Sequence, residues 1–283
     1  MKKVSKKTLE DLEFPQVVTL VADRCTTDPG RQRAQNIHPF TELELLQQSL
    51  GRTQEYLASF QNENRIPNHG FESVDEDLQV LRLENSLLPV PAFRRFATLA
   101  SLIESHQRFF TKFYDYFPCL KAWAAQAVFR KEIPLAVDAV IDRHGEIKDS
   151  ASPRLAEIRK EMRVLQGKIN QSFNAALSRY MKAEYLDDIR ESVLENRRVL
   201  AVRAMYRRKV KGSVLGTSKT GSIAYIEPNA VMAYSRELQM LGLEEREELE
   251  RILRHLGGEI RPFIQDLKMY QEVMAEIDLT AAK

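Results

Sequence analysis

The chain has 283 residues, of which 43% are hydrophobic and 29% are charged, and its net charge is +2. This composition is typical of a protein that buries a core, and so small a net charge does not by itself indicate a polyanionic partner. The two cysteines, Cys25 and Cys119, lie far apart in the sequence, which excludes a disulfide framework and favours a reducing, cytoplasmic location. We expect no membrane partner, because the sequence contains no run of about eighteen uncharged apolar residues.

Residues 1–148 are predicted to form a helical core. The segment Ala92–Phe117 has helical spacing and is rich in aromatic residues. At this spacing, aromatic side chains are more typical of a packed core than of a base-stacking platform. The sequence DRHGEIKD, Asp142–Asp149, predicts a loop or small hairpin around His144 and Gly145.

A long helix is predicted over residues 149–187. Ser152 suits the N-cap position and Pro153 the first helical position. Apolar residues then recur at spacings of three and four along Leu155–Tyr180. This spacing places one continuous apolar stripe on the helix.

A second long helix is predicted over residues 229–283. It carries a four-three apolar repeat along Leu249–Ile277, in which Pro262 predicts a kink. We expect the two helices to form an antiparallel coiled-coil hairpin, each about 45 Å long or more at 1.5 Å per residue.

Between the two helices, residues 188–228 show the short alternation and turn signals of three or four strands. The stretch GTSKTGS, Gly216–Ser222, resembles most of a phosphate-binding loop. Such a loop places a lysine directly after its second glycine and leads into a helix. Here Ser222 follows Gly221, and Ile223–Ile226 has the alternation of a strand. We therefore predict that these glycines form a tight connection between two strands.

The positive charge of the chain is concentrated in this strand-rich segment. Nine basic residues lie between Arg190 and Lys219, opposed only by Glu191 and Glu195, so the segment has a net charge of +7. A surface this basic fits a phosphate backbone, because each neutralised phosphate releases counterions. The alternative is a solvated basic surface without a ligand.

No catalytic residues and no metal ligands are predicted. The five histidines are scattered, without the spacing of a metal-binding pair. The acidic run Leu243–Glu250 is expected to be a solvated helix face. No cofactor is expected for this chain.

Four stretches together resemble the N-terminal half of the MutS-II proteins, the second bacterial branch of the MutS family. They are TLEDLEF (Thr8–Phe14), DPGRQRA (Asp28–Ala34), DSASPRLAEIR (Asp149–Arg159) and the segment Glu195–Val231. The most specific pieces are D-S-A-S-P and S-x-T-G-x-x-x-x-I-E-P. The resemblance keeps its order over nearly the whole chain.

The resemblance implies a mainly α fold in four parts. These are a helical MutS-like core at 1–148, an ascending lever helix at 149–187, a β-rich basic clamp at 188–228, and a descending lever helix at 229–283 that returns to the core. In the family, clamps of two protomers close around nucleic acid. The candidate contact residues are Arg197, Arg198, Arg203, Arg207, Arg208, Lys209, Lys211, Ser218, Lys219 and Thr220.

The resemblance also implies what the parent protein does. Family members continue into an ATPase with Walker motifs, which uses ATP and Mg²⁺ and mediates homodimerisation, and usually into a Smr nuclease domain. We expect this chain to be an N-terminal piece of such a protein and not itself an enzyme, and the F-x-E mismatch wedge is absent. The implied role is DNA repair and suppression of recombination by binding branched DNA.

Two alternatives remain open on the sequence alone. The same clamp could bind ribosomal RNA on stalled ribosomes. Alternatively, the chain could be a coiled-coil scaffold whose basic end binds an acidic protein.

Overall fold

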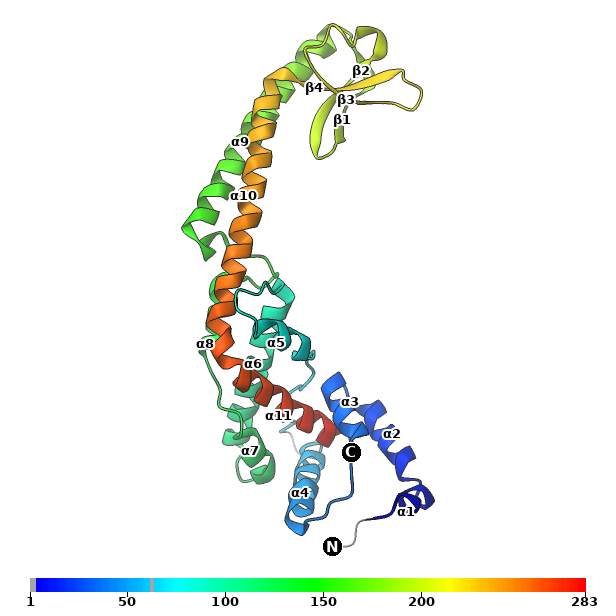
Figure 1. Cartoon of the computed structure of the whole chain (residues 1–283), viewed down its shortest axis with the longest axis vertical. Coiled ribbons are helices and arrows are strands. Elements are labelled where there is room, and N and C mark those ends of the chain that lie inside the picture. The colour runs from blue at the N-terminus through cyan, green and yellow to red at the C-terminus, as the bar shows by residue number, and fades with distance from the viewer. Residues whose placement is uncertain (1–3, 62–63) are drawn as a thin grey trace. The chain divides into compact units, whose positions relative to one another are not determined.

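A computed structural model describes residues 4–61 and 64–283 of the chain. Helices make up most of these residues, and a small antiparallel sheet accounts for the strands, which confirms the mainly α class (Figure 1). The chain divides into two compact units. Unit 1 comprises the residues up to Lys148 together with Ile252–Lys283, and unit 2 comprises Asp149–Arg251. Within the described ranges, no helix is both long enough and apolar enough to cross a membrane.

Unit 1 is built from helices. In chain order they are α1 (Lys6–Asp11), α2 (Phe14–Arg24), α3 (Asp28–Gln35), α4 (Leu43–Ser59), α5 (Asp75–Leu81), α6 (Val90–Lys112), α7 (Pro118–Ala124), α8 (Glu132–Val140), the end of α10 (Asn229–Ile260) from Ile252 onward, and α11 (Ile264–Ala282). A short 3-10 helix, η3 (Arg261–Phe263), precedes α11. An isolated bridge between Ile141 and Ile147 closes a small hairpin after α8, as the DRHGEIKD sequence predicted.

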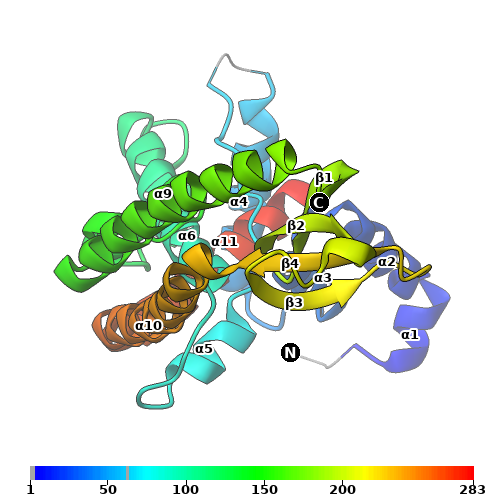
Figure 2. The same ribbon diagram turned by 90° about the horizontal axis from the view of Figure 1, so that it is seen from above.

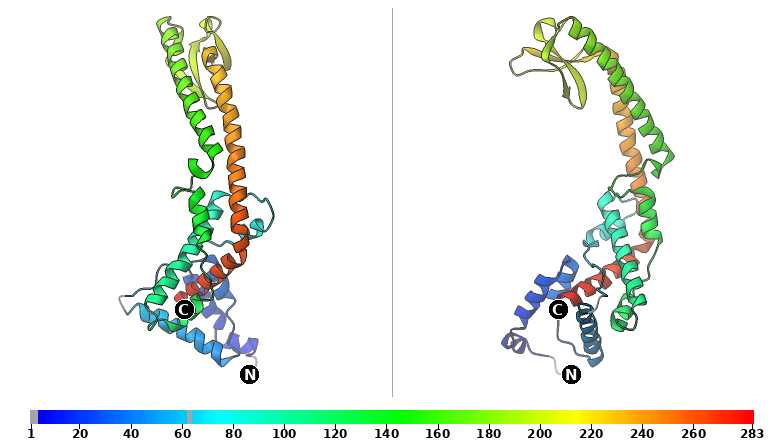
Figure 3. Two further views of the ribbon diagram at one scale, coloured as in Figure 1. Left: turned by 90° about the vertical axis from the view of Figure 1, so that its left-hand side faces the viewer. Right: turned by 180° about the vertical axis from the view of Figure 1, so that it is seen from behind.

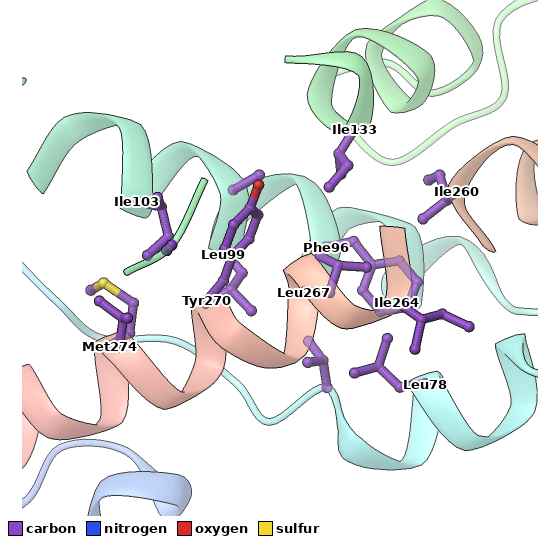
Figure 4. Close-up of a cluster of buried hydrophobic side chains, with 14 of the residues drawn as sticks. Leu78, Phe96, Leu99, Ile103, Ile133, Ile260, Ile264, Leu267, Tyr270 and Met274 are labelled. Carbon is purple, nitrogen blue, oxygen red and sulfur yellow. The ribbon is translucent and has the colours of Figure 1, made fainter. Parts of the chain in front are cut away.

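The core of unit 1 surrounds α11, of whose 19 residues 13 are buried. The aromatic side chains of α6 pack against it, and Phe93, Phe96 and Phe110 are fully buried. The phenylalanines of this segment are therefore core residues, as predicted, whereas Tyr114 and Tyr116, which follow α6, are exposed. Figure 4 shows part of this cluster, with side chains from α5, α6, α8, α10 and α11 meeting around Leu267 and Tyr270.

The repeat Leu249–Ile277 does not pack as we expected. From Leu256 onward its apolar residues lie in the core of unit 1 instead of along the first long helix. The helix α10 ends at Ile260, and the 3-10 helix η3, which contains Pro262, separates it from α11, where the sequence predicted a kink. A heptad repeat specifies that a face is buried but not which partner buries it, and here the helices of unit 1 do so.

Unit 2 contains a pair of helices, α9 (Pro153–Lys182) and the portion of α10 (Asn229–Ile260) that extends to Arg251. The two lie side by side in both views of Figure 3. Ser152 caps α9 by accepting a hydrogen bond from the Leu155 amide at 2.9 Å, and Pro153 takes the first position, as predicted. The Ser152 hydroxyl also donates to Glu248 of α10 at 2.5 Å.

The helix pair is antiparallel. Arg159 near the start of α9 contacts Glu245, while Lys168, further along α9, lies over the ring of Tyr234. Apolar contacts between Ile158, Leu165 and Leu241 fill the seam. The pairing therefore uses α10 from Tyr234 to Glu248 and not its last turns.

Four strands connect α9 to α10. They are β1 (Leu186–Leu194), β2 (Arg197–Arg203), β3 (Gly212–Thr217) and β4 (Ile223–Pro228), and the 3-10 helix η2 (Ala204–Tyr206) follows β2. All pairings are antiparallel, in the order β1-β2-β4-β3, which Figure 2 shows from above. The small sheet expected over residues 188–228 is thus present.

Candidate nucleic-acid interface

The sheet of unit 2 is held on the helices by its central strand. All four residues from Val199 to Val202 in β2 are fully buried. Leu200 and Val202 pack against Phe173 and Tyr180 of α9 in one apolar cluster. The sheet is thus anchored through the apolar residues of β2, and the polar connections between strands are left facing solvent.

The stretch GTSKTGS covers the last two residues of β3 and the connection from β3 to β4, residues 218–222. The Ser218 amide donates to the Ile223 carbonyl at 2.9 Å, and the Gly221 amide donates to the Ser218 carbonyl at 2.9 Å. Gly221 has a φ of +71°, in the region where a glycine is favoured over residues with a side chain. Gly221 therefore serves a hairpin that leads into a strand, as predicted, and not a loop that leads into a helix. Gly216 lies within β3, opposite Tyr225, and so is not part of the turn.

A second connection, from Arg203 to Lys211, carries most of the positive charge. Arg207, Arg208, Lys209 and Lys211 are all exposed. The Ala204 amide donates to the Ser222 carbonyl at 2.9 Å, which joins this connection to the hairpin described above. We call residues 203–211 and 218–222 together the basic loops.

The cations of the basic loops are largely free of internal partners. Within the described structure, Arg207, Arg208, Lys211 and Lys219 make no ion pair. Arg203 lies 4.0 Å from Asp188, whose side chain is fully exposed, so this pair contributes little. Positive charge that is not neutralised within the chain is available to an anionic partner.

Arg197 and Arg198 differ from the other candidate contact residues, because both are engaged within unit 2. Arg197 contacts the buried Glu227 at 3.1 Å and donates to Gln239 at 2.9 Å. Arg198 donates to Glu191 at 2.6 Å, and its guanidinium lies 4.2 Å from the centre of the Phe173 ring. Their placement shows a structural role, and a contact of either with nucleic acid stays a prediction.

The hydroxyls of the hairpin also have local partners. The Ser218 hydroxyl accepts a hydrogen bond from the Ile223 amide at 3.1 Å. Thr220 and Ser222 share a hydrogen bond at 2.8 Å. Ser218 thus stabilises the turn, while Thr220 is exposed beside Lys219 at its end.

Two tyrosines belong to the same surface and were not identified from the sequence. The rings of Tyr185 and Tyr206 stack with centroids 4.8 Å apart, and the Lys209 ammonium lies 5.6 Å from the centre of each. Both rings are partly exposed. The two residues stand 21 positions apart, and the Arg203 amide, which donates to the Tyr185 carbonyl at 3.0 Å, brings their segments together.

Unit 1 has its own buried polar network, centred on Asp278 of α11. Its carboxylate accepts hydrogen bonds from the amides and hydroxyls of Thr26 and Thr27, and it lies 3.1 Å from a ring nitrogen of His69. Burial opposes ionisation of this carboxyl, but the hydrogen bonds outweigh burial and hold its pKa well below the usual range. The network ties the α2–α3 connection to α11, which is a structural task.

Unit 1 also has a pocket of about 770 Å³ lined by Arg94, Arg95, His144 and neighbouring residues. Arg95 is already paired with Asp77 at 2.7 Å. Among the described residues, no group of three or more His, Cys, Asp and Glu side chains could hold a metal ion. Cys25 and Cys119 are free thiols.

Comparison with known proteins supplies the family. No family model matches the chain. It is 30% identical over 280 residues to Endonuclease MutS2 of Symbiobacterium thermophilum, covering 99% of this chain and 35% of that protein. The proteins of the same name from Bacillus velezensis and Carboxydothermus hydrogenoformans are 26% and 28% identical over 99% of this chain, of which the chain covers 36% each.

The chain therefore spans about a third of the length of the curated relatives it matches. The match extends over essentially the whole of the chain, and so includes the helices of unit 1 as well as the sheet and the basic loops of unit 2. The chain belongs to the MutS-II family.

Proposed function

We propose that the sheet of unit 2, residues 188–228, is a nucleic-acid clamp, in which the basic loops bind the phosphate backbone of branched or structured DNA. The observation that carries this proposal is the set of exposed cations on two adjoining connections, with Ala204 and Ser222 hydrogen-bonded between them. The contacts come from Arg203, Arg207, Arg208, Lys209, Lys211 and Lys219. Because these residues contact phosphates and not base edges, binding should depend only weakly on the DNA sequence.

In this proposal the paired helices α9 and α10 are the lever that carries the clamp. The chain supplies binding, whereas the ATP-driven and nucleolytic steps belong to the whole protein, which acts as a homodimer in DNA repair and suppression of recombination. The relatives bear the name endonuclease, which supports a role on nucleic acid. The helix pair supports the lever, since its seam and the Ser152–Glu248 contact join both helices over several turns.

The test reverses four charges at once, with Arg207, Arg208, Lys209 and Lys211 each changed to Glu. Every lost phosphate contact removes a factor of about 5.5 in affinity at 0.15 M salt, from the slope of 0.9 per phosphate. Four lost contacts therefore weaken binding to a four-way DNA junction about a thousandfold. The measurement is fluorescence anisotropy of a labelled junction.

The matched control is the double variant Lys160→Glu and Arg246→Glu, which reverses two exposed charges on the helix pair. It should bind as the unaltered chain does, apart from a weak long-range effect. Equal affinity of the fourfold variant and the unaltered chain would contradict the proposal. Competition between structured ribosomal RNA and the DNA junction shows which nucleic acid the chain prefers. Binding to an acidic protein with little dependence on salt concentration would favour the scaffold alternative.

A further inference from the structure

An exposed methionine lies in the middle of the basic loops. Met205 in η2 is 75% exposed, the highest value for any large hydrophobic side chain in the described ranges. Arg203, Arg207 and Arg208 lie within three positions of it, and all three are exposed. Isolated exposed apolar residues are common on proteins, but this one stands among cations with no acidic residue between Arg203 and Lys211.

The backbone that carries Met205 is held on both sides. Before it, the amides of Arg203 and Ala204 donate to the carbonyls of Tyr185 and Ser222. After it, the ring of Tyr206 stacks on Tyr185, and the Lys209 amide donates to the Tyr206 carbonyl at 2.8 Å. The methionine is thus presented to solvent by a fixed turn.

A partner that suits this arrangement offers negative charge around a small apolar surface. Continuous duplex DNA presents phosphates, but its base faces are covered by stacking. At a branch point, gap or duplex end, an unstacked base face becomes accessible beside the phosphates. Methionine is one of the side chains that insert as wedges between bases, and its thioether makes favourable contacts with aromatic rings.

We propose that Met205 is an apolar wedge that packs against an unstacked base while the surrounding cations hold the flanking phosphates. This inference rests on the proposed clamp function and adds the feature of the substrate that is recognised, namely interrupted base stacking. Tyr206, the next residue along the chain, is held in place by its stack on Tyr185. Discrimination between branched and continuous DNA then comes from one side chain, and affinity for both comes from the cations.

The test compares Met205→Ala with the unaltered 283-residue chain on two DNAs of equal length. One is a four-way junction with 2-aminopurine at the branch point, and the other is a continuous duplex with 2-aminopurine at the same position. Met205→Ala removes the apolar surface that would become buried against the base, and junction binding should weaken by about tenfold. The affinity for the duplex and the salt dependence of binding should stay unchanged. The unaltered chain should raise the fluorescence of 2-aminopurine at the branch point by keeping that base unstacked, and Met205→Ala should not.

The control is Met240→Ala, which truncates a methionine that is 58% exposed on α10 of the same unit. It should match the unaltered chain on both DNAs, and Met205→Leu should keep the preference for the junction. Equal junction affinity and fluorescence in Met205→Ala and the unaltered chain would overturn the wedge while leaving the clamp intact. An equal loss on both DNAs would also overturn it. If the unaltered chain binds no nucleic acid, the proposed clamp function itself is overturned. If the chain binds an acidic protein through Met205 in preference to DNA, the surface serves protein recognition and the wedge is overturned.

Discussion

The ion pair between Arg197 and Glu227 should be essential to the stability of the sheet. The Glu227 side chain is 2% exposed, and that of Arg197 is 25% exposed. The pair joins the first residue of β2 to β4, and Arg197 continues to Gln239 of α10. Replacing Glu227 with Gln leaves the guanidinium without its counter-charge. Breaking a buried pair costs about 3–5 kcal/mol, and because a quarter of Arg197 reaches water we expect about 2–3 kcal/mol.

The assay must separate the two units. Trp123 is the single tryptophan and lies in unit 1, so its fluorescence during urea unfolding reports unit 1. Hydrogen exchange of the amides from Val199 to Val202 reports β2 of unit 2. We expect these amides to exchange roughly 30- to 150-fold faster in Glu227→Gln, with the Trp123 transition unchanged.

A control variant measures how much an exposed ion pair contributes to stability. Arg154 and Glu244 also form an ion pair in unit 2, but their side chains are 48% and 42% exposed. Glu244→Gln should lower the free energy of unfolding by less than about 1 kcal/mol. If Glu227→Gln changes β2 exchange no more than this control does, the pair does not stabilise the sheet and the reasoning is refuted.

Three further predictions concern stability. The pKa of Asp278 is depressed in the folded state, so its ionised carboxylate stabilises the fold above the ordinary aspartate pKa, and this stabilisation is lost as the pH falls from there through the depressed pKa. Asp278→Asn should therefore be less stable than the unaltered chain at neutral pH and should lose less stability on acidification. An acid titration followed by Trp123 fluorescence measures both. A variant with the acid sensitivity of the unaltered chain would contradict this. Ser152→Ala removes the cap of α9 and should accelerate exchange of the Leu155 amide, with a cost of about 1 kcal/mol or more, whereas unchanged exchange would exclude the cap. Gly221→Ala forces a side chain to a φ of +71° in otherwise open space, and should cost roughly 1 kcal/mol by exchange of the β4 amides; a neutral result would mean that the turn relaxes.

Local features of the fold followed from the sequence because their causes are local. Ser152 and Pro153 start α9 through their own capping chemistry and fixed φ. Strand alternation after Gly221 distinguished a hairpin from a nucleotide-binding loop. The aromatic spacing of α6 predicted burial, and its phenylalanines are in the core.

Other features depend on contacts between distant residues, which no local pattern encodes. The repeat Leu249–Ile277 predicted a buried face but not its partner, and most of it packs within unit 1. The number of basic residues in the segment does not show that Arg197 and Arg198 are paired while the other cations are exposed. Their ion pairs with Glu227 and Glu191 form because β2 lies between β1 and β4 in the sheet. The stack of Tyr185 on Tyr206 depends likewise on where β2 ends beside the start of β1.

The salt dependence of binding tests the central claim most directly. If the six proposed cations each meet a phosphate, the logarithm of the affinity for a DNA junction should fall with the logarithm of salt concentration with a slope of about −5. Arg207→Ala with Arg208→Ala should reduce the magnitude of the slope by about 1.8, whereas Arg246→Ala on α10 should leave it unchanged. A slope that is the same in all three proteins, or near zero in the unaltered chain, would contradict the account.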